Sequence, residues 1–457
     1  MKHTNIYFIG IGGIGMSALA RWFKQKGCYV AGYDLTETEL TKHLSNQEIE
    51  ITYNDNSDLI PDSIKKSPQN TLIIYTPAIP EENNIYSYFK YNNFEIKKRA
   101  EVLGHISQEY FVIAVAGTHG KTTISTLIAH ILTHTGYGCN AFLGGISLNY
   151  DSNLILSNKK TMIIEADEYD KSFLNLCPNI AIITAIDTDH LDIYGNYDAL
   201  KETFIEFANK IAPHGILIVN EKIKHTFTKT FNNLISYALN DTNSTLTAEN
   251  ITYSQNYSRF DLFSAHYKIM GIQIPLLGDY NIQNTVAAIA VAKSLNIGDN
   301  KIKEALINYK GIKRRGQNII KTEQTIFIDD YAHHPAEIDA LLQSIKTNYP
   351  KKSITIIFQP HLYSRTKDLA KEFAKSLSRA DDIILLEIYP AREQPIEGIT
   401  YKTISNYINK KTYFVRNTSE ILILLKKLKP EILLSVGAGD IYKHIDDIKE
   451  LISNEYS

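Results

Sequence analysis

The chain of 457 residues is 44% hydrophobic and 21% charged, values typical of a globular protein, and it is long enough for two or three domains. Its 48 lysines and arginines are balanced by 50 aspartates and glutamates, which excludes a broad basic field, so we expect no nucleic-acid partner. Three widely spaced cysteines argue against a disulfide scaffold, and no apolar run approaches the ~20 residues that span a bilayer, so we expect a soluble, cytoplasmic protein without membrane insertion.

The first elements predict a Rossmann-like unit. In order they are a buried strand, a glycine turn, an amphipathic helix and a second strand, at residues 5–9, 10–15, 16–26 and 29–32. Gly10, Gly12 and Gly15 have the spacing of a dinucleotide-binding turn, and Asp34 follows the second strand, where an acid can reach a ribose hydroxyl. Because any pyrophosphate would suit this turn, the pattern favours a nucleotide diphosphate over a purely structural turn, without indicating a nicotinamide cofactor.

A second unit starts with a predicted strand over residues 111–116, which leads through Gly-Thr-His-Gly-Lys-Thr-Thr at 117–123 into a helix over 121–134. Backbone N–H groups of such a loop converge on phosphate oxygens, Lys121 adds a mobile cation, and the Thr122 hydroxyl can hold Mg²⁺. The full Walker pattern has one more glycine, where this chain has valine, so an ordinary glycine-rich turn is the alternative. The pattern favours a nucleoside triphosphate as ligand.

Acids follow the next two predicted strands, at residues 161–165 and 180–186. Glu165-Ala-Asp-Glu-Tyr-Asp170 lies beyond the first strand, and Asp187-Thr-Asp-His-Leu-Asp192 lies beyond the second. Each segment alone could supply helix caps or solvated side chains. Near Lys121, at the carboxyl edge of a parallel sheet, they could instead hold the Mg²⁺ of a nucleotide.

Residues 240–274 are rich in Asn, Ser, Thr and Tyr, and we expect them to form a small antiparallel extension. Beyond them strands alternate with helices, which predicts a third, doubly wound domain. The strands are expected at 325–328, 354–358, 383–387, 412–415 and 432–436, and the helices at 336–347, 366–377, 419–428 and the C-terminus. We therefore predict an α/β protein with three domains, at residues 1–105, 106–315 and 316–457.

Two loops of the third domain, at residues 329–335 and 359–366, follow strands that should end at the same crevice. A guanidinium such as Arg365 can bind a carboxylate bidentately, and His333 or His361 could accept a proton from an amine. Helix capping and buried hydrogen bonds are the alternative uses of these side chains. Beside a triphosphate site, such a crevice fits an amino-acid nucleophile.

These motifs, in this order, resemble those of the Mur ligase family. The resemblance covers nearly the whole chain and rests on Gly10-Ile-Gly-Gly-Ile-Gly-Met-Ser17, Gly117-Thr-His-Gly-Lys-Thr-Thr123, Glu165-Ala-Asp-Glu168, Asp189-His190, Asp329-Asp-Tyr-Ala-His-His-Pro335, His361 with Arg365, Tyr389-Pro-Ala-Arg392 and Gly437-Ala-Gly-Asp440. It implies an N-terminal Rossmann-like domain for a UDP-sugar, a central P-loop ATPase-type α/β domain, and a C-terminal Rossmann-like doubly wound domain that closes over an amino acid.

The resemblance also implies site residues. ATP would be bound by Gly117, Thr118, His119, Gly120, Lys121, Thr122, Thr123, Asn281, Asn284, Arg315 and Asp330, and Mg²⁺ by Thr122, Glu165 and His190. The UDP-sugar would be bound by Gly12, Gly13, Gly15, Ser17, Asp34 and Thr76, and the amino acid by Tyr331, His333, His361 and Arg365. Tyr280 and Gly316 depart from the family pattern, where histidine and phenylalanine are common. We predict no counterpart of the modified lysine that some relatives use.

The activity implied by the resemblance is ATP-dependent joining of L-alanine to the lactyl carboxylate of UDP-N-acetylmuramate, a step of peptidoglycan precursor synthesis. Transfer of the γ-phosphoryl group would give an acyl phosphate and ADP, and the amine of alanine would then displace phosphate. The catalytic residues would be Lys121, His190, His361 and Arg365. We expect a monomer or a weak homodimer.

Three alternatives stay open. A recycling ligase of the same family would join a whole peptide to the same sugar, although residues 170–174 and 361–366 look more like the alanine enzyme. A nicotinamide-dependent oxidoreductase would use the first glycine turn but would leave the phosphate loop and its acids without a purpose. A nucleotide-switched binding protein would need both sites but would have no synthetic activity.

Overall fold

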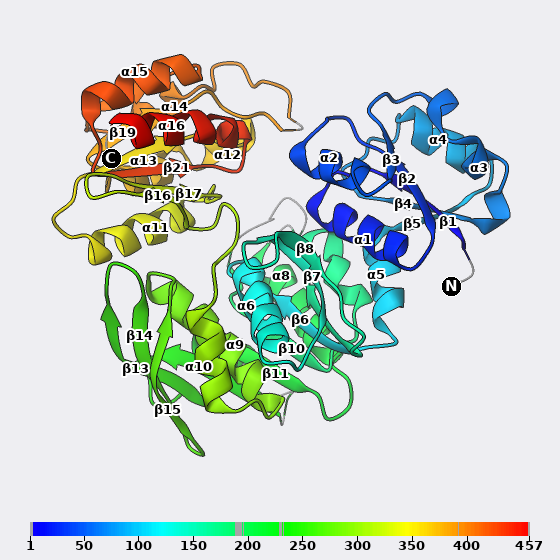
Figure 1. Ribbon diagram of the computed structural model, residues 1–457, viewed down its shortest axis with the longest axis horizontal. Coiled ribbons are helices and arrows are strands. Elements are labelled where there is room, and N and C mark those ends of the chain that lie inside the picture. Colours follow the sequence, from blue (N-terminus) through cyan, green and yellow to red (C-terminus); the bar gives the residue numbers. More distant parts are fainter. Residues whose placement is uncertain are drawn as a thin grey trace. The chain divides into compact units, whose positions relative to one another are not determined.

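The computed structural model describes residues 3–187, 194, 196–227, 231, 233–391 and 393–455. The chain contains three sheets flanked by helices (Figure 1). It divides into two compact units. The first comprises Met1–Glu249, Asp261–Ile272 and Gln283–Tyr309, and the second comprises Asn250–Phe260, Gln273–Ile282 and Lys310–Ser457.

The N-terminal sheet confirms the predicted Rossmann-like opening. Its strands run parallel in the order β3-β2-β1-β4-β5. They are β1 (Asn5–Ile9), β2 (Tyr29–Tyr33), β3 (Glu50–Thr52), β4 (Thr71–Tyr75) and β5 (Glu95–Lys98). The helices are α1 (Ile14–Gln25), α2 (Glu39–Ser45), α3 (Asp62–Lys65), α4 (Asn84–Tyr91) and α5 (Arg99–Ser107), with 3-10 turns η1 (Ser57–Leu59) and η2 (Pro68–Asn70).

Both faces of this sheet are covered, which explains why its strands are continuous apolar runs. Ile6 and Phe8 of β1 pack in the core that includes α1, whereas Tyr7 and Ile9 pack in a second core with Phe89 of α4. The alternation follows from the two-residue period of a strand. The turn after Ile9 therefore emerges at the carboxyl edge of a fully buried strand, where open α/β sheets bind their ligands.

The central sheet has ten strands in the order β15-β14-β13-β12-β11-β10-β6-β9-β7-β8. The pairs from β13 through β7 are parallel, as predicted for its core, and β8 pairs antiparallel with β7 at the edge. The strands are β6 (Phe111–Ala116), β7 (Asn140–Ser147), β8 (Ser152–Ile155), β9 (Thr161–Glu165), β10 (Ile180–Ile183), β11 (Ile216–Asn220), β12 (Leu234–Leu239), β13 (Leu246–Tyr253), β14 (Ser258–Ser264) and β15 (Lys268–Ile274). The helices are α6 (Lys121–His134), α8 (Tyr197–Asn209), α9 (Asp279–Ser294) and α10 (Asp299–Ile307), with 3-10 turns η3 (Tyr169–Asn175) and η4 (Glu221–Thr226).

Strand β10 ends three residues before its predicted end. Just beyond that end, the Thr184 hydroxyl donates a hydrogen bond to the carbonyl of His119 in the phosphate loop, while its backbone N–H still donates to the Ala116 carbonyl of β6 at 3.1 Å. An apolar run in the sequence does not reveal such a contact.

The N-terminal and central sheets share one hydrophobic core within the first unit. Trp22 of α1 packs against Tyr110 and Phe142, with ring centroids 5.9 and 5.4 Å apart. Arg21 donates a hydrogen bond to Asn153 of β8, which is fully buried. The helix that follows the first glycine turn is therefore anchored on the edge of the central sheet.

The predicted antiparallel extension is confirmed in β13, β14 and β15. Ser254 N–H donates to the Tyr257 carbonyl, and Ser264 N–H donates to the Tyr267 carbonyl, both at 3.0 Å, in the turns that join these neighbouring strands. Connections this short cannot cross over between parallel strands, so the neighbours run antiparallel.

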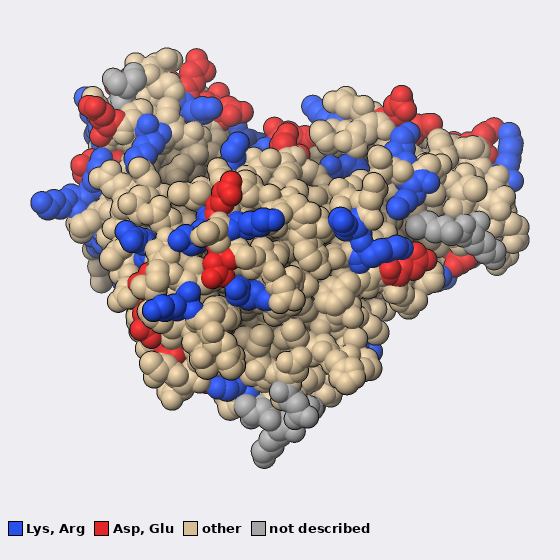
Figure 2. All heavy atoms as spheres, turned by 60° about the horizontal axis from the view of Figure 1, so that its bottom comes forward, with Lys and Arg blue, Asp and Glu red and all other residues tan. Residues whose placement is uncertain are grey.

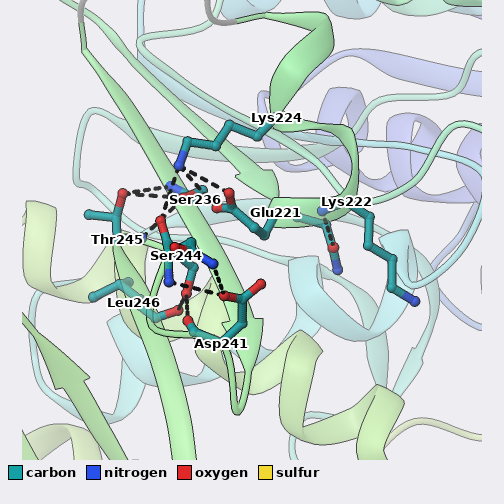
Figure 3. A network of polar contacts seen from close by, with 10 residues as sticks. Glu221, Lys222, Lys224, Ser236, Asp241, Ser244, Thr245 and Leu246 are labelled. Carbon is teal, nitrogen blue, oxygen red and sulfur yellow. Dashed lines mark hydrogen bonds and ion pairs between the residues drawn. The ribbon is translucent and has the colours of Figure 1, made fainter.

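A polar network fixes the connection between β12 and β13 (Figure 3). Lys224 Nζ donates to both carboxylate oxygens of Glu221 at 3.0 and 3.2 Å, and to the Asn243 carbonyl at 3.2 Å. Ser236 and Thr245 exchange hydrogen bonds between backbone N–H groups and hydroxyls at 3.1 and 3.0 Å. These partners satisfy one another, which identifies the network as a structural support of the sheet.

The C-terminal sheet confirms the predicted doubly wound domain, with strands in the order β16-β17-β21-β18-β19-β20 and only β16 antiparallel. The strands are β16 (Gln317–Lys321), β17 (Ile326–Asp330), β18 (Ile354–Phe358), β19 (Asp382–Leu385), β20 (Thr412–Phe414) and β21 (Ile432–Val436). The helices are α11 (Pro335–Asn348), α12 (Tyr363–Asp368), α13 (Ala370–Leu377), α14 (Lys402–Ser405), α15 (Thr418–Leu428) and α16 (Ile445–Glu455), with the 3-10 turn η5 (Asp440–His444).

Two separate cores lie on the two faces of this sheet. Residues of α11 and α13 pack with Ile356 of β18, and residues of α15 and α16 pack with its neighbour Ile357. The helix predicted over 366–377 is in fact two helices. It begins three residues earlier, and Leu369, with φ −112°, interrupts it.

Charged side chains of both signs lie among uncharged ones on the face drawn in Figure 2. This mixing agrees with the near-balance of acidic and basic residues in the sequence. Among the described residues, every helix is too short or too polar to cross a membrane.

Candidate active site

The first glycine turn, between β1 and α1, is held by Asp34. Gly12 N–H donates to Asp34 Oδ2 at 2.7 Å, and a Cβ on Gly12 would lie 2.8 Å from the same oxygen, so the turn has no room for a side chain there. Thr76 packs on the turn, with its Cγ2 2.9 Å from where Gly10 would carry a Cβ. Ser17 is fully buried, and its hydroxyl donates to a carbonyl of α1 at 2.9 Å. The predicted UDP-sugar residues thus gather around one turn.

Arg99 belongs to this region, although the sequence did not indicate it. It begins α5, and a Cβ on Gly15 would lie 2.8 Å from its Nη1, so the guanidinium covers the glycine turn. The preceding residue, Lys98, forms an ion pair with Asp170 at 2.7 Å. No spacing rule connects residue 99 with the turn, because the two meet only through the pairing of β1 with β4 and β4 with β5.

The phosphate loop joins β6 to α6, as predicted. Gly117 and Gly120 have φ values of +122° and +80°, which favour glycine. A Cβ on Gly117 would collide with Thr184, and a Cβ on Gly120 would lie 2.6 Å from Asn284 Oδ1 of α9. The loop backbone is therefore fixed by its neighbours, and the N-terminus of the 14-residue helix α6 begins directly after it.

Lys121 forms an ion pair with a carboxylate of the same chain, that of Glu168. Its Nζ donates to the Gly117 carbonyl at 2.8 Å and to Glu168 Oε1 and Oε2 at 2.8 and 2.9 Å. The two side chains are 16% and 1% exposed. Burial alone would lower the pKa of Lys121, but the carboxylates around it, Glu168 first, outweigh burial and raise this pKa. The lysine is therefore held as a cation, and Glu168, which the sequence offered only as one of several acids beyond β9, is its partner.

Thr122 and Glu165, two of the predicted metal ligands, are in contact. Thr122 Oγ1 donates to Glu165 Oε1 at 2.8 Å, and Gly144 N–H donates to Glu165 Oε2 at 2.9 Å. No group of three or more His, Cys, Asp or Glu side chains that could hold a metal occurs among the described residues. His190, the third predicted ligand, lies outside them. Hydroxyl and carboxylate oxygens are donors that Mg²⁺ prefers, so the Thr122–Glu165 pair fits that ion.

Of the other predicted ATP residues, His119 belongs to the loop and Asn284 lies against it. His119 Nε2 lies 3.3 Å from Asp187 Oδ2, and this hydrogen bond lowers the pKa of Asp187. Asn281 and Asn284 are three residues apart on α9, so they share one face of the helix. Asn281 donates to a backbone carbonyl at 2.9 Å, and Asn284 approaches Gly120.

Arg315 and Asp330 meet within the second unit. Asp330 ends β17 and accepts hydrogen bonds from two backbone N–H groups, at 2.6 and 2.7 Å, one of them from Gly316. Burial raises the pKa of Asp330 to about 6. Arg315 lies over the ring of Tyr331, 5.1 Å from its centroid, and Arg314 lies at the same distance from that ring.

Tyr331, His333 and His361 gather beyond β17 and β18, as the strand order predicted. The ring centroids of Tyr331 and His333 are 5.4 Å apart, and those of His333 and His361 are 6.1 Å apart. Burial lowers the pKa of His333, with its Nδ1 3.0 Å from the Tyr331 carbonyl. A neutral imidazole at neutral pH is the form that can accept a proton.

Arg365 adds a positive charge to this crevice. It lies on α12, and its Nη1 is buried without a hydrogen-bond partner in the described part of the chain. Its charge contributes to the lowered pKa of His333. A buried guanidinium nitrogen gains free energy from an anion that can accept its hydrogen bond, and a carboxylate has the matching shape.

Three family models match the chain: "Mur ligase family, catalytic domain" over residues 5–111, "Mur ligase middle domain" over 115–292 and "Mur ligase, glutamate ligase domain" over 314–453. A UDP-N-acetylmuramate–L-alanine ligase from Christiangramia forsetii is 44% identical over 458 residues, which cover 100% of this chain and 98% of that protein. The chain belongs to the Mur ligase family. The resemblance found in the sequence is thereby confirmed. A ligase of the same name from Flavobacterium psychrophilum is 45% identical, over 98% of this chain and 97% of that protein.

Solved structures support the fold of this Mur ligase. The UDP-N-acetylmuramate–alanine ligase of Thermotoga maritima matches with a TM-score of 0.84 and 27% identity, over 99% of this chain and 100% of that one. A murein peptide ligase from Psychrobacter arcticus matches with a TM-score of 0.72 and 22% identity over 99% of both chains, which shows the shared fold alone. The three-domain α/β architecture, with Rossmann-like sheets at both ends, is confirmed.

Proposed function

We propose that this Mur ligase joins L-alanine to the lactyl carboxylate of UDP-N-acetylmuramate and converts ATP to ADP and phosphate. The observation that carries the proposal is the 44% identity, over the whole chain, to a ligase named for those two substrates. The product would be a peptidoglycan precursor, which places the protein in cell-wall synthesis.

The reaction has two bond-forming steps. A lactyl carboxylate oxygen attacks the γ-phosphorus of ATP, the bond to ADP breaks, and an acyl phosphate forms. The amine of alanine then attacks the acyl carbon, the bond to phosphate breaks, and a base takes a proton from the nitrogen as the amide forms. Activation is needed because phosphate is a far better leaving group than hydroxide.

The phosphate loop at residues 117–123 would bind the triphosphate through its backbone N–H groups. Lys121, which Glu168 holds as a cation, would then contact the phosphates and stabilise the charge that moves during transfer. Thr122 and Glu165, with His190, would hold Mg²⁺. The bound ion would neutralise phosphate charge.

The remaining nucleotide contacts would come from α9 and from residues that follow it in the chain. We assign Asn281 and Asn284 to the adenine side, and Arg315 and Asp330 to the rest of the nucleotide. The UDP-sugar would lie on the first glycine turn, in contact with Gly12, Gly13, Gly15, Ser17, Asp34 and Thr76. Asp34 has one carboxylate oxygen on Gly12 N–H, so it orders the turn as well.

Alanine would bind in the crevice of the C-terminal sheet. Arg365 would bind the alanine carboxylate by donating hydrogen bonds to it, because Nη1 is buried there without a protein partner among the described residues. The lowered pKa of His333 suits an acceptor for the amine proton. Tyr331 and His361 would complete the pocket. We propose Lys121, His190, His361 and Arg365 as the catalytic residues of the whole reaction.

We propose domain limits at residues 105 and 315, with the UDP-sugar, ATP and amino-acid functions in chain order. The N-terminal and central sheets share one hydrophobic core. The limit at residue 105 therefore divides the UDP-sugar function from the ATP function, but it does not divide two independently packed domains.

The proposal is tested by ADP release and product mass with purified protein, Mg²⁺, ATP, UDP-N-acetylmuramate and one acceptor at a time. L-Alanine should give turnover and a mass increase of one alanine residue, whereas a tripeptide should give none. Preferred turnover with the tripeptide would instead identify a recycling ligase. With ¹⁸O in the lactyl carboxylate, one label should appear in the released phosphate, and its absence would refute the acyl phosphate.

A further inference from the structure

Two segments that the sequence singled out, Tyr389-Pro-Ala-Arg392 and Gly437-Ala-Gly-Asp440, have no part in the proposed reaction. The structure places Tyr389 and Gly439, one from each segment, next to the amino-acid crevice of the second unit; Arg392 lies outside the described residues. Tyr389 stacks on His361, with centroids 5.7 Å apart and ring planes 19° apart. A Cβ on Gly439 would lie 2.7 Å from Tyr389, so the glycine lets this ring settle against the backbone.

The crevice contains a backbone conformation that needs support. Leu362, between His361 and α12, has φ +72° and ψ 136°. L-residues with a side chain rarely adopt such values, and they persist only where surrounding contacts hold them. This turn sets the direction in which α12 leaves, and therefore the place of Arg365.

Backbone hydrogen bonds hold the turn from one side. Leu362 N–H donates to the Tyr389 carbonyl at 2.9 Å, and Tyr389 N–H donates to the Pro360 carbonyl at 2.8 Å. These reciprocal bonds bracket His361, which forms an isolated parallel bridge with Tyr389. They do not reach α12 itself.

The side chain of Glu393 provides the support on the side of α12. Its Oε2 accepts a hydrogen bond from Ser364 N–H at 3.0 Å, and its Oε1 accepts one from the Ser364 hydroxyl. Burial raises the pKa of Glu393, but the hydrogen bonds from Ser364 and the Tyr363 backbone outweigh burial and lower it. The Glu393 carboxylate is therefore ionised at neutral pH, and it accepts two hydrogen bonds from Ser364, the residue immediately before Arg365.

We propose that Glu393 is a positioning residue of the amino-acid site: by capping the start of α12 it holds the strained turn at Leu362 and so sets the guanidinium of Arg365. The proposal rests on the assignment of the crevice to alanine made above. Two neighbouring residues would then position the crevice. Tyr389 stacks on His361, and Glu393 caps the helix that carries Arg365.

The test compares Glu393→Ala and Glu393→Gln with the unchanged protein in steady-state kinetics for each of the three substrates. Glu393→Ala should raise the KM for L-alanine about 10- to 100-fold, because a small displacement of a binding group is costly. The KM values for ATP and UDP-N-acetylmuramate should stay within about twofold. Glu393→Gln keeps one acceptor oxygen and should recover part of the loss. Glu397→Ala, at an exposed position four residues after Glu393, is the matched control.

Hydrogen exchange of the full chain supplies a second readout. Peptides covering residues 361–369 should exchange faster in Glu393→Ala, whereas the phosphate loop should be unchanged. An unaltered KM for alanine would overturn the proposal. A raised KM with unaltered exchange would also overturn it, since Glu393 would then contact alanine itself. A parallel rise of all three KM values with a lower Tm would indicate general destabilisation and would equally reject it.

Failure of the proposed function gives a different result. If the unchanged protein shows no turnover with L-alanine, the activity assignment fails. The exchange measurement still decides whether Glu393 holds the turn at Leu362.

Discussion

The phosphate loop and the amino-acid crevice both contain a cationic side chain with buried nitrogen atoms, but the two differ in whether the described part of the chain supplies a hydrogen-bond partner for it. Lys121 is neutralised from within, by a carboxylate 2.8 Å away that is 1% exposed. Arg365 has a buried Nη1 without a partner among the described residues. A ligand at the first site must share or replace a protein anion, whereas a carboxylate at the second site gains a hydrogen bond that the described residues do not provide.

Under the proposed function, the first site serves phosphoryl transfer and the second serves amide formation. Internal pairing keeps the phosphate loop ordered before nucleotide binds, since a buried lysine without an anion would tend to lose its proton. At the second site, Arg365 Nη1, which has no partner among the described residues, favours occupancy by the amino acid. The two regions should therefore respond differently when their charges are removed.

The largest expected effect is that of Lys121→Ala. ADP formation should fall more than about 10³-fold, because the phosphates lose their main protein cation. Binding of UDP-N-acetylmuramate, measured by calorimetry, should be unchanged. Lys301→Ala, an exposed lysine of α10, should behave like the unchanged protein. Normal turnover of the Lys121 variant would remove this residue from the mechanism.

Glu168→Gln tests the internal pairing. It leaves Lys121 buried without its anion, and the free energy of unfolding should fall by about 3 kcal/mol, as for broken buried pairs. ATP should then raise the Tm of the variant more than that of the unchanged protein, because phosphate replaces the missing charge. Glu202→Gln on α8 serves as an exposed control. Equal shifts with ATP would show that nucleotide does not take over the lysine.

Arg365→Ala tests the other cation. The KM for L-alanine should rise about 30- to 100-fold, which corresponds to a charged hydrogen bond of roughly 2–3 kcal/mol. The KM for ATP should change little. Arg379→Ala, which removes an exposed ion pair with Asp339, should leave both constants unaltered. A change confined to the KM for ATP would place Arg365 at the nucleotide instead.

The smallest effect concerns Asp330 and pH. Its pKa of about 6 lies above the ordinary value of 3.8, so the folded state binds more protons than the unfolded state between these values. Stability should therefore fall as the pH rises from about 4 to 6, by roughly 1–3 kcal/mol at most. Chemical denaturation across this range measures it, and Asp330→Asn should flatten the profile. An unchanged profile in the variant would assign the dependence to another group.

The elements were predictable from the sequence because their signals are local. The strand, loop and helix of residues 111–134 have the limits predicted, since an apolar run and positive-φ glycines mark them directly. The break at Leu369 and the early end of β10 were not predicted. Beside the end of β10, Thr184 contacts His119, which lies 65 residues away in sequence.

The same distinction applies to the sites. The sequence by itself determined the family and the candidate site residues, because Lys121, Glu165, His361 and Arg365 lie in short motifs whose order identifies that family. Only the tertiary structure decided how those residues are held: Glu168 on Lys121, Arg99 over Gly15 and Glu393 on the turn before Arg365. Such partners are 47, 84 and 29 residues apart, and chain distance carries no information about contacts that strand order and burial create.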